Sequence, residues 1–311
     1  MDDDLRDLLA DDELVAFIES VRASADDPAP SVIEQRAAQV ERVKRRPPGP
    51  DVDTVMNMVI PAHSPLSARV YVPQQPARAL LVYFHGGGWS VGSLDSHDAI
   101  CRHLAVGAGI AVVAVDYRLA PENPWPAGVD DAMVAVGWAM QHSMTLAGTS
   151  VVGVGGDSSG GHLAAVTCLL RRDLGAPAPA FQVLLYPNLD LTLSQPSIKT
   201  LGEGWVPTAS GMQATIDRWV PNNVDRSHPR VSPLFEPDLA GLPPAIIVTA
   251  ERDPLRDEGD KYAHALSEAG VPVIHRREPD LIHGFLTFGA NSPACQEARE
   301  RVVADITTLV G

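Results

Sequence analysis

The stretch "GVGGDSSGGH", residues 153–162, joins a run typical of a buried strand, "SVVGVGG", to a run typical of a helix, "GGHLAAVTCLLRRDL". Two serines, Ser158 and Ser159, occupy the turn between these runs. The order of strand, glycine-rich turn and helix predicts an α/β protein. In an open parallel sheet, reactive groups gather at the carboxyl ends of the strands, which is where this turn lies.

The spacing of the glycines separates the two serines. A turn of the form G-x-S-x-G exposes the serine hydroxyl, and it needs small residues two positions before and after the serine because the turn brings those backbones together. Around Ser158 these positions hold Gly156 and Gly160, whereas Ser159 would place Asp157 at the first of them. Ser158 is therefore the candidate nucleophile. The backbone N–H of Ser159, at the start of the helix, is a candidate donor to developing negative charge.

Other interpretations of this turn are weaker. "GVGGDS" approaches the dinucleotide motif G-x-G-x-x-G, but Ser158 stands at the third glycine and no acid follows at the required distance. "GDSSGG" is similar to the serine motif of chymotrypsin-like proteases, which are antiparallel barrels and do not fit this context. The alternative to a catalytic site is a glycine-rich turn whose serine takes no part in any reaction.

Strand and helix patterns alternate from residue 54 onward, which predicts a mainly parallel sheet with right-handed crossovers. The first two strands are close enough in sequence to form an antiparallel hairpin. The predicted strands are 54–60, 68–72, 79–85, 110–117, 150–156, 181–187, 244–251 and 272–278. The predicted helices after residue 54 are 98–108, 128–142, 160–174, 257–270 and 294–310.

Two segments stand outside this alternation. Residues 1–50 predict two helices, 11–24 and 31–46, the second opened by Ser31 and Glu34 in a reciprocal capping arrangement. Residues 190–230 hold two tryptophans, several prolines and a short helical pattern between two predicted strands. A long insertion of this kind in a compact fold is usually a functional lid.

The remaining candidate site residues also follow predicted strands. "HGGGW" contains Gly86, Gly87 and Gly88, whose backbone can approach a ligand closely and present N–H groups to it. The chain order serine, acid, histidine then points to Asp253 in "AERDPLRDEG" and to His283 in "EPDLIHGFL". Glu251 and Asp257 are rival acids, and Asp257 is expected to cap the next helix.

The composition excludes several classes of function. With 24 Lys and Arg against 39 Asp and Glu, the net charge of −15 repels nucleic acid and anionic lipid. No apolar run approaches the ~20 residues that span a bilayer, and the acidic N-terminus resembles no secretory or transit signal. We therefore predict a cytoplasmic protein with no nucleic-acid partner. Three cysteines far apart in sequence are expected to be mostly buried thiols, not a disulfide or zinc site.

The motifs "HGGGW", "DYRLAPENPWPA", "GGDSSGGH", "DPLRDEG" and "HGF", in this order, closely resemble those of the hormone-sensitive-lipase-like carboxylesterases, bacterial family IV, of the α/β-hydrolase fold. The resemblance covers roughly residues 50–310, and five ordered motifs make coincidence improbable. It implies a mainly parallel central sheet flanked by helices, with a helical cap. The cap would comprise residues 1–50 and 190–230, and the catalytic core residues 51–189 and 231–311.

The resemblance also implies roles for single residues. Ser158 matches the nucleophile, His283 the general base and then acid, and Asp253 the group that orients His283. Gly87 and Gly88, with Ser159, match the oxyanion donors, and Gly86 is a further candidate donor. The family commonly has alanine after the nucleophile, but since the donor there is a backbone N–H, Ser159 should leave the oxyanion hole working.

The implied reaction is hydrolysis of small esters with short to medium acyl chains through an acyl-enzyme, without metal or cofactor. A lactone, amide or peptide bond is an alternative at the same site, and a non-catalytic receptor of the same fold is a second, disfavoured because the serine, acid and histidine are all present. Family members are often monomers or dimers. Candidate substrate contacts are Trp89, Trp205, Met212 and Trp219, although such residues equally often form the core of a cap.

Overall fold

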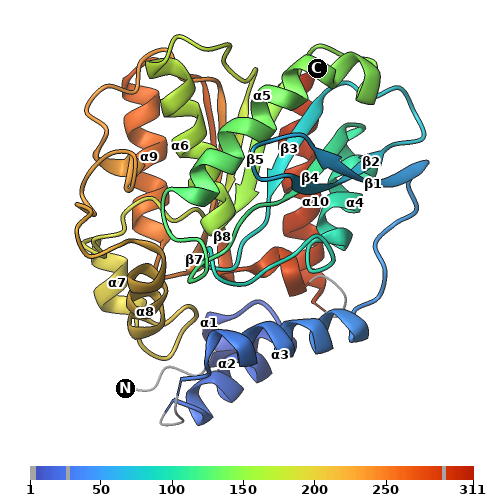
Figure 1. Cartoon of the computed structure of the whole chain (residues 1–311). Coiled ribbons are helices and arrows are strands. Elements are labelled where there is room, and N and C mark those ends of the chain that lie inside the picture. The colour runs from blue at the N-terminus through green and yellow to red at the C-terminus, as the bar shows by residue number, and fades with distance from the viewer. Residues whose placement is uncertain (1–4, 26–28, 289–291) are drawn as a thin grey trace.

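The computed structural model describes residues 5–25, 29–288 and 292–311. Its strands are β1 (Thr54–Ile60), β2 (Leu66–Val72), β3 (Leu80–Phe84), β4 (Ala111–Asp116), β5 (Val152–Asp157), β6 (Gln182–Leu185), β7 (Ala245–Arg252) and β8 (Val273–Ile282). They form one sheet in the order β1-β2-β4-β3-β5-β6-β7-β8 (Figure 1). β2 runs antiparallel to both β1 and β4, and every later pair is parallel. The predicted hairpin and mainly parallel sheet are confirmed.

Helices cover both faces of this sheet. They are α4 (Asp98–Ala108), α5 (Ala127–Ala147), α6 (Ser159–Asp173), α9 (Arg256–Glu268) and α10 (Pro293–Val310). α5, α6 and α9 pack on one face and share a core with Leu80, Val82 and Phe84. α4 and α10 pack on the other face, with Leu81 and Tyr83. Burial on both faces explains why β3 is apolar at every position.

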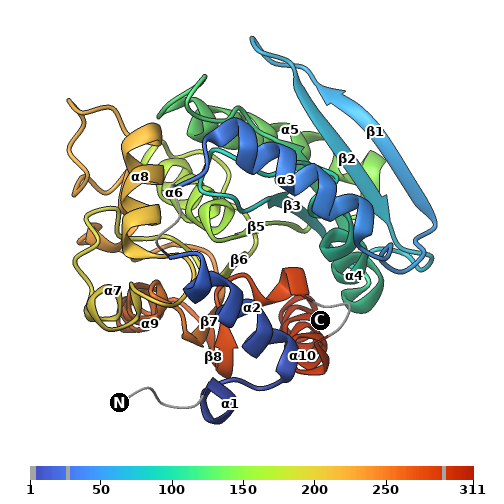
Figure 2. The same cartoon turned by 90° about the horizontal axis from the view of Figure 1, so that it is seen from below.

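The two segments outside the alternation lie together below the sheet in Figure 1 and in front of it in Figure 2. The first holds α1 (Leu5–Leu8), α2 (Asp12–Ala23) and α3 (Val32–Arg45), and the second holds α7 (Pro196–Leu201) and α8 (Ala209–Trp219). The one-turn α1 is additional to the prediction. The capping box of α3 is confirmed, with Ser31 N donating to Glu34 Oε2 over 2.8 Å. Residues 1–4 and 26–28 of the first segment lie outside the described residues.

Side-chain contacts join these two segments across the chain. Arg22 of α2 donates from Nε to the carbonyl of Gly204 over 3.2 Å. Its guanidinium lies over the ring of Trp205, 5.5 Å from the ring centre. Two short 3-10 helices complete the chain, η1 (Pro233–Phe235) and η2 (Phe285–Phe288).

The cysteines and the apolarity of the helices were also subjects of prediction. Cys101, Cys168 and Cys295 are free and buried, as predicted. Within the described ranges, no helix is both long enough and apolar enough to cross a membrane.

Candidate active site

The structure brings Ser158, Asp253 and His283 together at one edge of the sheet. Each follows directly the last residue of a strand: Ser158 after β5, Asp253 after β7 and His283 after β8. β6 lies between β5 and β7, and β8 pairs with β7, so these three strand ends are near neighbours. The parallel arrangement therefore gathers residues that are up to 125 positions apart in sequence.

The three side chains form a hydrogen-bonded chain. Ser158 Oγ lies 2.9 Å from His283 Nε2, and His283 Nδ1 lies 2.8 Å from Asp253 Oδ2. Asp253 is fully buried, and its other oxygen, Oδ1, accepts from the N–H of Leu255 over 2.8 Å. With Nδ1 donating to the carboxylate, Nε2 is left as the acceptor for the serine proton.

The turn around Ser158 has the backbone that its glycines imply. Ser158 has φ 54° and ψ −120°, a positive φ that non-glycine residues rarely adopt and that typifies strained functional turns. A Cβ at Gly160 would overlap the carbonyl oxygen of Phe84, and a Cβ at Gly156 would overlap both that oxygen and the Gly160 backbone. Both flanking positions thus admit only glycine.

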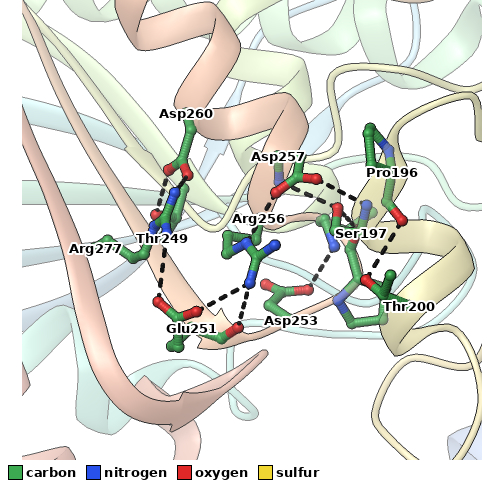
Figure 3. Close-up of polar contacts among 12 residues, drawn as sticks. Pro196, Ser197, Thr200, Thr249, Glu251, Asp253, Arg256, Asp257, Asp260 and Arg277 are labelled. Atoms are coloured by element: carbon green, nitrogen blue, oxygen red, sulfur yellow. Dashed lines mark hydrogen bonds and ion pairs between the residues drawn. The ribbon is translucent and has the colours of Figure 1, made fainter.

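The two rival acids are occupied elsewhere, as Figure 3 shows. Glu251 pairs with Arg256 over 3.0 Å and with Arg277 over 3.5 Å. Asp257 accepts from the Ser197 N–H over 2.8 Å and from Arg256 Nε over 2.8 Å. The expectation that Asp257 caps the next helix is wrong: it lies inside the first turn of α9, where it holds the start of α7.

The glycine loop lies beside Ser158. Gly87 and Gly88 have φ of 127° and 58°, in the region that favours glycine, and both line the cavity that contains Ser158. Among the described residues, no protein acceptor takes either of their N–H groups. Gly86 differs, because its N–H donates to Asp157 Oδ1 over 3.0 Å. That donor is already committed, which corrects the inclusion of Gly86 among the oxyanion donors.

Asp157, next to the candidate nucleophile, belongs to the sequence motif and connects several parts of the candidate site. Its buried carboxylate accepts from Tyr83 Oη over 2.8 Å and lies 3.2 Å from His97 Nε2, besides accepting from Gly86. Burial raises the pKa of Asp157, but His97 and the other donors outweigh this effect and hold the pKa below its usual range. The residue ties the glycine loop to the nucleophile turn.

A cavity of about 340 Å³ opens over these groups. Trp89 and Met212 line it, and their role as substrate contacts stays a prediction. Trp205 and Trp219 do not line it: Trp205 packs under Arg22, and Trp219 is fully buried in a stack with Trp89 at 4.3 Å between ring centres. Both tryptophans are buried in the hydrophobic core clusters instead of lining this cavity.

Part of the cavity wall comes from residues outside the predicted motifs. Ser158 Oγ lies 3.2 Å from Asn188 Oδ1, just beyond the carboxyl end of β6, where the rule of strand ends applies as well. The face of α3 formed by Gln35, Gln39, Arg42 and Val43 also lines the cavity. Its helical spacing was visible in the sequence, but not the surface that it would meet.

Comparisons with known proteins identify the family of the chain. Residues 81–287 match the family model described as alpha/beta hydrolase fold. Carboxylesterase NlhH of Mycobacterium tuberculosis is 43% identical over 245 residues, 77% of each chain, and the ethyl acetate hydrolase of Pseudomonas putida is 33% identical over 96% of this chain and 97% of its own. The crystal structure of an α/β-hydrolase enzyme from the metagenome of Lake Arreo superposes with a TM-score of 0.91 at 32% identity, covering 97% of this chain and 98% of that one.

The family match spans more than half of the chain, and the named relatives are ester hydrolases. Enzymes of this kind act on small-molecule esters. The chain belongs to the hormone-sensitive-lipase-like carboxylesterases of the α/β-hydrolase fold, and it is a serine carboxylester hydrolase.

Proposed function

We propose that Ser158, His283 and Asp253 form the catalytic triad of this esterase. The observation that supports the proposal best is the continuous hydrogen-bonded chain from Ser158 Oγ through His283 to Asp253, placed in the cavity. His283 Nε2 takes the serine proton while Oγ attacks the ester carbonyl carbon. Buried Asp253 fixes the histidine tautomer and stabilises its charged form.

The tetrahedral oxyanion is held by the N–H groups of Gly87, Gly88 and Ser159. Gly87 and Gly88 line the cavity, and no described residue accepts from their N–H groups. Ser159 begins α6, where the helix dipole favours negative charge. The alcohol leaves with the proton from His283. Water, deprotonated by the same histidine, then cleaves the acyl-serine bond and releases the acid.

We propose short to medium acyl esters as substrates. A cavity of about 340 Å³ is at the small end of the range for ligand pockets, roughly 300–1,000 Å³. The relative that matches nearly the whole chain is named for ethyl acetate, a small ester. A lactone offers the same carbonyl to the same groups and is the alternative substrate class.

We also propose that residues 1–50 and 190–230 act as one cap over a core of residues 51–189 and 231–311. In support, α3 and α8 line the same cavity, and Arg22 joins α2 to the 190–230 segment. A cytoplasmic location and a monomeric or homodimeric state stay predictions.

The triad is tested with Ser158→Ala, assayed on a graded series of para-nitrophenyl esters and on several lactones. Loss of the attacking oxygen should lower kcat by a factor on the order of a thousand or more, while the protein stays folded by circular dichroism. A wild-type rate that is highest on the shorter acyl esters supports the proposed substrate range. If the enzyme prefers lactones over every ester, lactones replace short to medium acyl esters as the proposed substrates. A fully active Ser158→Ala would refute the triad.

A further inference from the structure

Three arginines line the cavity of an otherwise strongly acidic chain. Arg42 and Arg46 come from α3 and from the residue that ends it, and Arg218 comes from α8. The one acidic residue among the described cavity-lining residues is Asp157, whose carboxylate is already used by Tyr83, Gly86 and His97. The wall of the active-site cavity is therefore positive, on a protein of net charge −15.

These arginines have no anionic partner within the described ranges. Arg46 donates from Nη1 to the backbone carbonyl of Ser96 over 3.2 Å, and Arg218 donates from Nη2 to Thr215 Oγ1 over 3.0 Å. Arg218 Nε is buried, and no described residue accepts from it. By contrast, Arg36 on the same α3 makes two 2.8 Å bonds to the carboxylate of Glu122.

Arg42 and Arg46 keep part of their side chains in solvent, and Arg218 is half-buried. Burial, and then the positive charge of Arg42, lower the pKa of Arg46, and burial lowers the pKa of Arg218. Basic residues in the last turn of a helix interact favourably with the helix dipole, which accounts for each arginine singly. The helix dipole does not explain why arginines from two different helices line the same cavity.

We propose that the preferred substrates are esters that carry a second, negatively charged group, such as a carboxylate, which Arg42, Arg46 and Arg218 bind while the ester carbonyl lies at Ser158. This rests on the proposed function, because it takes the cavity around Ser158 as the substrate site. Guanidinium groups suit carboxylates, since their N–H donors match both oxygens. The charged group lies either on the acyl side or on the alcohol side of the ester, and the two are distinguishable.

The test compares matched pairs of esters on the full chain. On the acyl side, the para-nitrophenyl monoester of adipic acid is paired with para-nitrophenyl hexanoate, which has the same chain length and no charge. On the alcohol side, the acetate ester of a terminal hydroxypentanoic acid is paired with pentyl acetate. In at least one pair, kcat/KM should be higher for the anionic ester.

Variants then assign the effect to the arginines. Arg218→Gln and the double variant Arg42→Gln with Arg46→Gln should each lower the ratio of kcat/KM, anionic over neutral, by about tenfold, as for loss of a charged hydrogen bond. Arg218→Lys should recover part of the ratio by keeping the charge. Arg45→Gln is the matched control: it lies on the same helix, exposed and outside the cavity wall, and should leave the ratio unchanged.

A wild-type ratio below one in both pairs, unaltered by the arginine variants, overturns the inference. Should a variant fail to fold, salt gives an independent reading on the wild type, because screening at about 1 M must reduce a charge-based preference. Failure of the proposed function looks different: hydrolysis of the neutral esters would then persist in Ser158→Ala.

Discussion

Ser159 is the residue at which this chain departs from the common form of its motif. Its side chain is fully buried beside Tyr117, and burial raises the pKa of that phenol while the Ser159 hydroxyl opposes the shift. The Tyr117 hydroxyl itself donates to the carbonyl of His85 over 2.8 Å. The Ser159 hydroxyl is thus buried without a hydrogen-bond acceptor among the described residues, whereas its backbone N–H belongs to the first residue of α6 and is the proposed oxyanion donor.

This placement predicts a mild phenotype for Ser159→Ala. We expect kcat/KM on a para-nitrophenyl ester to stay within about threefold of the wild type, because the donor is the backbone N–H, which alanine keeps. The melting temperature should not fall, since the substitution removes a buried hydroxyl that has no hydrogen-bond partner among the described residues. Steady-state kinetics and a thermal melt measure both. A loss above about tenfold in a folded variant would mean that the hydroxyl itself takes part in the reaction.

At the scale of elements, α3 holds the glycine loop in place. Arg36 Nε donates to the carbonyl of Ser90 over 2.8 Å, and Gln39 Oε1 accepts from the N–H of Gly92 over 2.8 Å. Both contacts fall just after the glycines that supply the proposed oxyanion donors. α3 is thus both a wall of the cavity and a support for the loop beneath it.

Gln39→Ala should therefore lower kcat more than it raises KM. A small displacement of the loop misplaces the donors relative to the developing oxyanion, and shifts of about 1 Å can cost on the order of a hundredfold, so we expect a loss of kcat of roughly tenfold. Kinetics on a neutral ester, with a thermal melt, give the readout. Gln213→Ala is the control, because Gln213 lies exposed on α8 and its side chain bonds Asp217 of the same helix. Equal kinetics for Gln39→Ala and the control would remove the positioning role.

The elements also show which parts of the site were predictable from sequence. Ser158, Asp253 and His283 follow strands, and a parallel sheet fixes where strand ends meet. The contact of Gln39 with Gly92 joins residues 53 positions apart, and that of Arg22 with Gly204 joins residues 182 apart. Such contacts depend on how amphipathic helices dock, which their periodicity does not specify. The burial of Trp219 was not predictable for the same reason, because it depends on how the helix that carries Trp219 docks against Trp89 in the core.

At the scale of the whole molecule, buried histidines make stability depend on pH. His162 is fully buried, donates from Nε2 to the carbonyl of Val231 over 2.9 Å, and packs against Trp89 and Trp219 at 5.2 and 5.1 Å between ring centres. Burial lowers its pKa to about 4. Burial, and then the charge of His97, lower the pKa of His85 in the glycine loop to about 4 as well.

The sign of the effect follows from these shifts. An unfolded histidine titrates near 6.5, so between pH 6.5 and about 4 the unfolded chain binds protons that the folded chain does not. The stability from each neutral histidine is therefore present above pH 6.5 and is lost as the pH falls toward 4. At pH 5 the loss from His162 amounts to about 2 kcal/mol, a large part of a typical stability of 5–15 kcal/mol.

His162→Gln should flatten this dependence. A glutamine amide can donate to the Val231 carbonyl but does not take up a proton, so the difference in unfolding free energy between pH 7 and pH 5 should shrink by about 2 kcal/mol. Denaturant unfolding at the two values measures that difference, which stays informative even if the variant is less stable at both. His264→Gln is the control, because that histidine is 75% exposed. If His162→Gln and the wild type lose equal stability on acidification, protonation of His162 is not what weakens the packing of Trp89 and Trp219 behind the glycine loop.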